Sequence, residues 1–300
     1  MLLNVLSEKK RLLLNILFIA IALVIAYALF SIFDAKKILA QADFFLLLLA
    51  VLSFVLSIVL WNFGWAQILG IGFIRANKIG FASLSGLLTP FGIGNDLLKG
   101  LLAKQDGLSL EKSVAASVCA KLIKMFFAVL LSALGLLSVL YLFPSQFNLL
   151  LSLFVLVSGM SVGLFILSRK KFSLEGEGSI AVFTRHLNSF FSRPSFSASL
   201  FLLASFLLEF LSFFLCAKAI SLDIPFVLLF ASFSAVFLAG KIPLSPQGLG
   251  IVEFLAVYVL FTASTEAVAA LIFLWNICRL WFPILLSAPF YLRFHLKTNH

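Results

Sequence analysis

Charged residues are scarce in this sequence. They make up 11% of the 300 positions, whereas hydrophobic residues make up 63%. A soluble domain carries about 25% charged residues and covers much of its surface with them. Too few polar side chains are present here to form a water-facing shell, which excludes a soluble globular protein. The apolar residues also occur in blocks of about 20, the length at which a helix spans a bilayer.

Cysteine and histidine are also scarce, with three residues of each, and the sequence has no nucleotide-binding motif. Cys119, Cys216 and Cys278 lie inside apolar stretches without metal-binding spacing, so we interpret them as small core residues. The three histidines fall in a predicted loop or in the tail of the sequence. No glycine-rich phosphate-binding motif is present, which argues against ATP as the direct energy source. We therefore expect no catalytic residue, no metal ion and no cofactor.

Six long apolar segments are predicted to be full transmembrane helices. The segments are Leu12–Phe33, Phe44–Phe63, Ser113–Leu142, Phe147–Ser168, Phe196–Ile220 and Val268–Leu292.

Two further apolar stretches, Ile79–Leu102 and Phe226–Phe261, are interrupted in the middle by proline and glycine. Proline removes a helix donor, and glycine permits a sharp reversal of the backbone. Within a bilayer such a break is tolerated only where protein or water covers the freed backbone groups. We therefore predict two re-entrant hairpins. The backbone breaks are Pro90, Gly92 and Gly94 in the first, and Pro243, Pro246, Gly248 and Gly250 in the second.

The two breaks resemble each other and divide the sequence into similar halves. Each is followed by an acid, then by a long span with basic residues inside it. The expected fold class is an all-α polytopic membrane helix bundle with an internal repeat, residues 1–145 and 146–300. Each half has an odd number of crossings, so the second half is expected to be inverted, a recurring design in transporters. Residues 169–195 form the connecting loop, which we place in the cytoplasm.

The net charge of +10 is explained by basic loops. With both termini in the cytoplasm, nearly all loop Lys and Arg residues lie inside, and only Lys36 and Lys37 lie outside. This bias favours a multi-pass protein of the cell membrane with cytoplasmic N- and C-termini. No basic run interleaved with aromatic residues indicates a nucleic-acid surface, so nucleic acid is not an expected partner.

Charged residues within apolar segments cost roughly 2.5–3.5 kcal/mol each to insert, and so they indicate function. The candidates for substrate binding or coupling are Asp96, Lys99, Lys121, Lys124, Lys241, Glu253 and Arg279. Lys121 and Lys124 are three residues apart and therefore share one helix face. These two lysines and the guanidinium of Arg279 suit an anionic, phosphate-bearing headgroup. Pairing with Asp96 or Glu253 is the structural alternative.

The two acids that follow the breaks have two interpretations each. Glu253 is predicted to begin a half-helix, where it couples protons or substrate, or else acts as a cap or an ion-pair partner. Asp96 is a coupling residue or the N-terminal cap of a half-helix over Leu97–Ala103. Glu209 lies inside another span, and we expect it to form an ion pair elsewhere in the bundle.

Both breaks resemble the motifs of a known family. Thr89–Gly100, with Gly107-Leu108-Ser109 after it, resembles the first motif; Ile242–Glu253, together with Arg279, resembles the second. The family is the flippase-like transmembrane domain of lysylphosphatidylglycerol synthases. The chain departs from it at Pro246-Gln247-Gly248, where the family usually has Pro-Gly-Gly.

The resemblance implies translocation of a phospholipid or lipid-linked intermediate with a charged headgroup. The synthases also carry a soluble aminoacyl-transfer domain, for which this sequence has no room, so we expect no synthase activity. The alternatives are a polytopic enzyme acting on lipid phosphates and an accessory subunit of a lipid-modifying synthase. Expected partners are a membrane lipid and either a partner synthase or further copies of the chain.

Overall fold

The structure is a computed structural model that describes residues 37, 40–88, 93–142, 159, 179–192, 195–240, 252, 256, 260 and 263–297. Within these ranges all regular elements are helices, which confirms the all-α class. The predicted span Leu12–Phe33 lies outside the described residues, and so does Phe147–Ser168 apart from Gly159. The second break, with Pro243, Pro246, Gly248 and Gly250, also lies outside them.

Among the described residues, four helices are long and apolar enough to cross a membrane, and they correspond to four of the predicted spans. Helix α3 continues past the predicted end at Phe63. The fourth is a continuous run of α12, the short π-helix η6 and α13. The bounds are α3 Phe44–Leu69, α6 Leu110–Leu142, α9 Phe196–Ala219, α12 Thr265–Asn276, η6 Ile277–Trp281 and α13 Phe282–Lys297.

The ends of the long helices follow local sequence rules. Asp43 caps α3, because its carboxylate accepts hydrogen bonds from the N–H groups of Phe45 and Leu46 at 2.8 and 3.2 Å. The helix ends at Gly70, whose φ of 75° most other residues adopt only with strain. Ser195 and Ser264 cap α9 and α12 in the same way as Asp43 caps α3.

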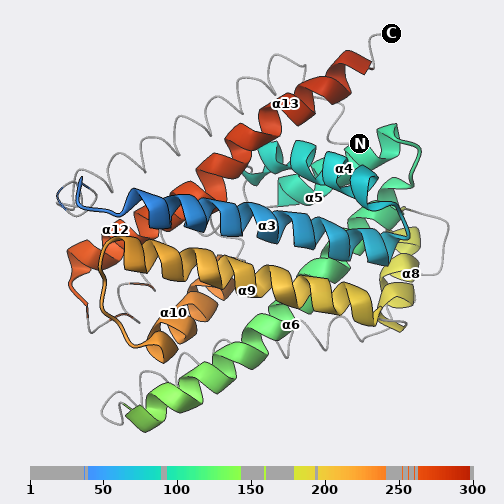
Figure 1. The fold of residues 1–300 in the computed structure, drawn as a ribbon. Helices are drawn as coiled ribbons and strands as arrows, with labels where there is room; N and C mark the ends of the chain where they lie inside the picture. Colours follow the sequence, from blue (N-terminus) through green and yellow to red (C-terminus); the bar gives the residue numbers. More distant parts are fainter. Residues whose placement is uncertain are drawn as a thin grey trace.

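Helices α3 and α9 are antiparallel and lie side by side along their length (Figure 1). The N–H of Asp43 donates to the carbonyl of Ala219 at 2.8 Å at one end. Near the other end, Gly64 lies against Leu202, and a Cβ on Gly64 would come within 2.7 Å of that side chain. The missing side chain therefore permits the two helix backbones to approach closely.

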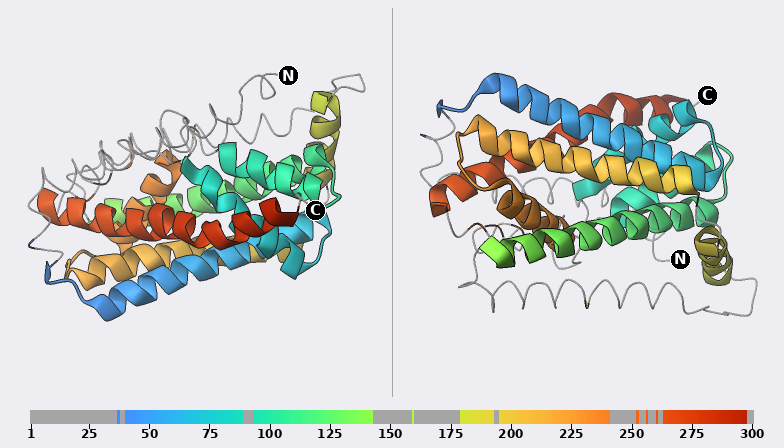
Figure 2. Two further views of the ribbon diagram at one scale, coloured as in Figure 1. Left: turned by 90° about the horizontal axis from the view of Figure 1, so that it is seen from above. Right: turned by 60° about the horizontal axis from the view of Figure 1, so that its bottom comes forward.

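The other described helices pack against this pair or against one another. Helix α10 (Phe226–Ala239) packs against α6, and its Phe233 and Phe237 contact Phe206 of α9. The short helix α8 (Ser179–Ser192) packs against α6 at one end of the bundle (Figure 2). Helix α8 forms most of the described part of the predicted connecting loop, and it contains His186.

The outer faces of the long helices are apolar and exposed. On α3 the exposed side chains recur every three to four residues, as one stripe of a helix does. They are Phe44, Phe45, Leu48, Leu52 and Leu56. On α6, Phe126, Leu130 and Leu134 form a similar stripe. Contiguous apolar surface of this extent is expected to face lipid.

The first broken stretch forms a hairpin of two short helices. Helix α4 (Phe73–Ser83) leads through the 3₁₀-helix η2 (Leu84–Leu88) to α5 (Ile93–Gln105). With 11 and 13 residues, α4 and α5 span roughly 15–20 Å each, less than the ~30 Å hydrocarbon core. At the open end, Arg75 Nε pairs with Asp106 Oδ2 at 2.5 Å. The chain therefore leaves the hairpin close to where it entered, which supports the predicted re-entrance.

The position of the first break differs from the prediction. Pro90 and Gly92 lie outside the described residues, whereas Gly94 belongs to the first turn of α5. Because α5 begins at Ile93 rather than Leu97, Asp96 lies inside its first turn. The interpretation of Asp96 as an N-terminal cap was therefore wrong.

The hairpin geometry predicts the outcome of a labelling experiment. With the native cysteines replaced by alanine, single cysteines at Gly72 and Gln105 are expected to react with a membrane-impermeant maleimide from the same side of the membrane. Both positions are exposed and lie at the open end of the hairpin. Labelling of the two from opposite sides would show that the stretch crosses the bilayer.

Candidate functional site

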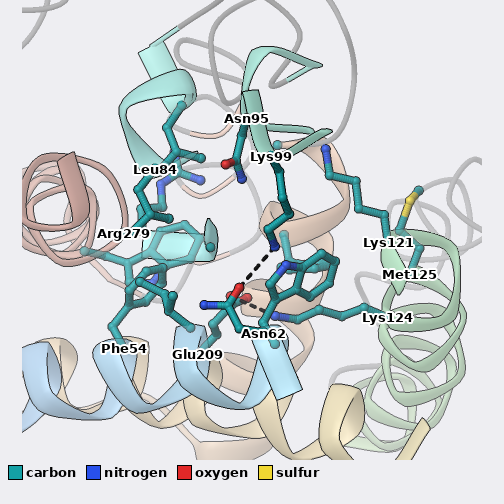
Figure 3. A pocket seen from close by; sticks show the side chains of 17 residues that line it. Phe54, Asn62, Leu84, Asn95, Lys99, Lys121, Lys124, Met125, Glu209 and Arg279 are labelled. Atoms are coloured by element: carbon teal, nitrogen blue, oxygen red, sulfur yellow. Dashed lines mark hydrogen bonds and ion pairs between the residues drawn. The ribbon is translucent and has the colours of Figure 1, made fainter. Parts of the chain in front are cut away.

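A cavity of about 230 Å³ lies between α3, the hairpin, α6, α9 and η6. Its lining contains four basic side chains, Lys99, Lys121, Lys124 and Arg279, and the acid Glu209. Lys99 comes from the hairpin, the other two lysines come from α6, and Arg279 enters from the opposite side (Figure 3). Four of the five bases that the sequence analysis selected therefore line one cavity.

Lys99 is almost completely buried, with 2% of its surface exposed. Its ammonium donates to Asn62 Oδ1 at 3.0 Å and lies 4.6 Å from the ring centre of Trp65. Among the residues that the structure describes, no carboxylate lies within ion-pair distance of Lys99 Nζ. The amide oxygen and the indole face stabilise the ammonium only partly, because neither carries a full negative charge.

Asn62 is held in place by the hairpin. Its amide nitrogen donates to Asn77 Oδ1 of α4 at 3.3 Å. Its side chain lies over Gly80, where an added Cβ would come within 2.2 Å of Asn62 Oδ1. Glycine at position 80 therefore provides the space that lets Asn62 reach Lys99.

Lys124 is buried as well but has a carboxylate partner. Its ammonium pairs with Glu209 Oε1 at 2.8 Å and donates to Ser205 Oγ at 2.9 Å. The Ser205 hydroxyl in turn donates to the carbonyl of Ser57 at 2.9 Å. The structure thus confirms that Glu209 forms an ion pair within the bundle, and it also shows that Glu209 lines the cavity.

Lys121 pairs with Asp96, and this ion pair joins α6 to the first turn of α5. Asp96 is 7% exposed and is not among the residues that line the cavity. The alternative that the buried bases pair with the acid after the first break is thus confirmed for Lys121. Lys99 instead bonds to Asn62, and Lys124 pairs with Glu209.

Arg279 projects from the π-helix η6, where the N–H of Phe282 bonds to the carbonyl of Ile277. Pro283 follows and has no N–H for the carbonyl of Arg279, which favours this local widening of the helix. Arg279 Nε donates to Asn276 Oδ1 at 2.7 Å, and its guanidinium lies 4.3 Å from the ring centre of Trp275. The guanidinium of Arg279 from η6 and the indole of Trp275 from the last turn of α12 thereby line the cavity together.

Two buried polar atoms of the lining form no hydrogen bond within the described ranges. They are Asn95 Oδ1 and the indole N–H of Trp275. Buried polar groups normally form hydrogen bonds, so both atoms could bind a polar group that enters the cavity. Within the same ranges, no three His, Cys, Asp or Glu side chains lie close enough together to hold a metal ion.

The sequence analysis identified all four bases of the cavity. Of its other candidates, Lys241 and Glu253 lie outside the described residues. It missed Trp61, Asn62 and Trp65. The available signal was a polar Asn between two Trp residues in an apolar span, because an amide oxygen and indole rings can together stabilise a buried cation. Trp61 contacts two bases, because its ring centre lies 5.8 Å from Lys99 Nζ and 5.2 Å from Lys124 Nζ.

Comparison with known proteins gives one family. The model of the lysylphosphatidylglycerol synthase TM region matches residues 12–287. No curated protein matches the chain significantly. The matched range includes every helix that lines the cavity.

Proposed function

This chain belongs to the lysylphosphatidylglycerol synthase TM-region family, and we propose that it translocates a membrane lipid with a charged headgroup. Its family and its apolar helices make it a multi-pass membrane protein with a lipid-related role. The proposal adds that the cavity holds the headgroup while the lipid changes leaflet. The convergence of Lys99, Lys121, Lys124 and Arg279 on one cavity is the observation that carries it.

The energetics of the cluster favour an anionic headgroup. Burial of an ammonium costs several kcal/mol unless a counter-charge offsets it. Lys99 forms no ion pair with a described carboxylate, and Asp96, which acts on it from a longer range, is paired with Lys121. An anion in the cavity would therefore provide the close counter-charge that Lys99 lacks. Because four of the lining elements, α3, α6, α9 and the α12–α13 run, are long and apolar enough to span the bilayer, the natural source of that anion is a lipid headgroup.

Other sequence predictions complete the proposal. The inverted repeat over residues 1–145 and 146–300 would give the cavity access to either leaflet in turn. Glu253, at the second break, remains our candidate for coupling, and Lys241 for a second headgroup contact. The cell membrane and cytoplasmic termini remain the predicted location and orientation.

The proposal predicts a defect in the Arg279→Gln variant. Purified chain in proteoliposomes, supplied with fluorescent anionic phospholipid, is expected to move the lipid between leaflets, as dithionite quenching reports. Loss of the guanidinium is expected to slow this movement about tenfold or more, since a charge-assisted contact contributes about 1.5–3 kcal/mol. Arg185→Gln, which removes an exposed arginine on α8, is the matched control and should leave the rate unchanged.

The same assay, together with assays of phosphate release and co-purification, separates the competing functions. If Arg279→Gln translocates lipid at the normal rate, the cavity is not the headgroup site. Absence of translocation for every headgroup, with phosphate released from a lipid phosphate, would favour the membrane enzyme. Absence of both, with a synthase that co-purifies, would favour the accessory subunit.

A further inference from the structure

The two most deeply buried lysines of the cavity differ in their counter-charges. Lys124 is held by Glu209, whereas Lys99 has no carboxylate partner among the described residues. Both ammonium groups nevertheless lie within 6 Å of the same Trp61 ring centre, at 5.8 and 5.2 Å. Both lysines also line the same cavity of about 230 Å³, so an anion that enters it would lie near both.

Both lysines also retain donors. An ammonium has three N–H donors. Lys99 uses one on Asn62, and Lys124 uses two, on Glu209 and Ser205. An oxygen-rich group entering the cavity would bind the remaining donors, and it would compete with Glu209 for Lys124.

We propose that Glu209 is an internal counter-ion that a phosphomonoester headgroup displaces from Lys124. This inference rests on the proposed function and specifies its substrate class. A phosphomonoester carries a charge of about −1.5 to −2 and three terminal oxygens, enough to bridge Lys99 and Lys124. A phosphodiester such as phosphatidylglycerol carries one charge and two free oxygens, so it matches one lysine rather than two.

The counter-ion also sets how tightly the headgroup is held. A site that passes its substrate on must bind it strongly enough to admit it and weakly enough to release it. Glu209 is 16% exposed at its side chain, lines the cavity and returns to Lys124 when the headgroup leaves. Its carboxylate therefore weakens binding of the phosphate and promotes release. Because a headgroup must compete with this carboxylate for Lys124, Glu209 also favours headgroups with more than one negative charge and so determines specificity.

The first test is binding to the full-length purified chain in detergent, followed by tryptophan fluorescence because Trp61 and Trp65 contact the lysines. The probes are dihexanoyl phosphatidic acid, dihexanoyl phosphatidylglycerol and inorganic phosphate. Phosphatidic acid is expected to bind about tenfold more tightly than phosphatidylglycerol, the effect of one extra charge-assisted contact. Equal affinity for the two lipids would overturn the headgroup class. Inorganic phosphate that binds as tightly as phosphatidic acid would identify a free phosphate, rather than a lipid, as the ligand.

The second test is a double-mutant cycle. Glu209→Gln is expected to bind phosphatidic acid about tenfold more tightly than the unchanged chain, because the competitor for Lys124 is removed. Lys124→Gln is expected to bind it less tightly, and Glu209→Gln should give no gain in that background. Glu209→Asp, with a shorter arm, should give a smaller gain in the same direction, and Glu266→Gln, an exposed acid on α12, should give none.

A purely structural role of Glu209 makes the opposite prediction. Glu209→Gln and Glu209→Asp would then weaken binding or leave it unchanged, and either result overturns the inference. Translocation of fluorescent lipid, measured on the same variants, keeps this failure separate from that of the proposed function. If transport is unaffected by the substitutions at Glu209 and Lys124, the counter-ion role is rejected and the translocator function is retained. If binding follows the double-mutant cycle but no transport occurs, the translocator function is rejected and the counter-ion role is retained.

Discussion

Lys99→Met is expected to abolish lipid translocation while the chain stays folded and melts at the same or a higher temperature. The ammonium of Lys99 is buried without a carboxylate partner among the described residues, a costly arrangement for stability alone. Methionine has a similar length and is apolar and flexible, so it should fill the space beside Trp65. The headgroup, by contrast, would lose a full counter-charge, and we expect transport to fall about 100-fold.

Two measurements check this result. Dithionite quenching in proteoliposomes gives the transport rate, and scanning fluorimetry in detergent gives the melting temperature. Lys104→Met, an exposed position on the same helix, is the control and should change neither. If Lys99→Met transports normally, or if it loses transport only because it melts far earlier, Lys99 has a structural role instead.

Gly86→Ala is expected to destabilise the hairpin and inactivate the protein with it. A Cβ at position 86 would lie 2.6 Å from the carbonyl oxygen of Gly94 and 2.7 Å from the backbone N of Asn95. Backbone atoms cannot rotate away as a side chain can, so α5 would have to shift relative to η2. Such overpacking costs typically about 1–3 kcal/mol and would move Lys99 away from Asn62.

Gly72→Ala is the matched control for this substitution. Gly72 precedes the same hairpin, has an ordinary φ of −66°, and nothing lies within 4 Å of its added Cβ. Melting temperature and lipid translocation should both fall in Gly86→Ala and remain unchanged in Gly72→Ala. Equal behaviour of the two variants would show that the close approach of η2 and α5 does not maintain the site.

The sequence predicted the membrane class and the bases of the site because both follow from local composition. Blocks of about 20 apolar residues are sufficient to identify α3, α6, α9 and the α12–α13 run. Charges inside such blocks stand out for the same reason, and Lys121, Lys124 and Arg279 all line the cavity.

Partners and helix starts could not be predicted in the same way. Glu209 and Lys124 are far apart in the sequence, and only the packing of α6 against α9 brings them within 2.8 Å. The first turn of α5, at Gly94 and Asn95, packs closely against Gly86 of η2, a tertiary contact for which the sequence has no local motif. Asn62 reaches Lys99 because Gly80 of another helix leaves room for it, which no periodic pattern reveals.

Blocking the cavity tests the central claim, that the lipid headgroup passes through it, most directly. In a chain whose native cysteines are replaced by alanine, Met125→Cys places a thiol in the cavity lining. Phe126→Cys places one on the outer face of the same helix, where Phe126 is 55% exposed. We expect a thiol reagent to stop translocation in proteoliposomes with Met125→Cys and to leave Phe126→Cys active. Transport that survives complete modification of Cys at position 125 would contradict a headgroup path through this cavity.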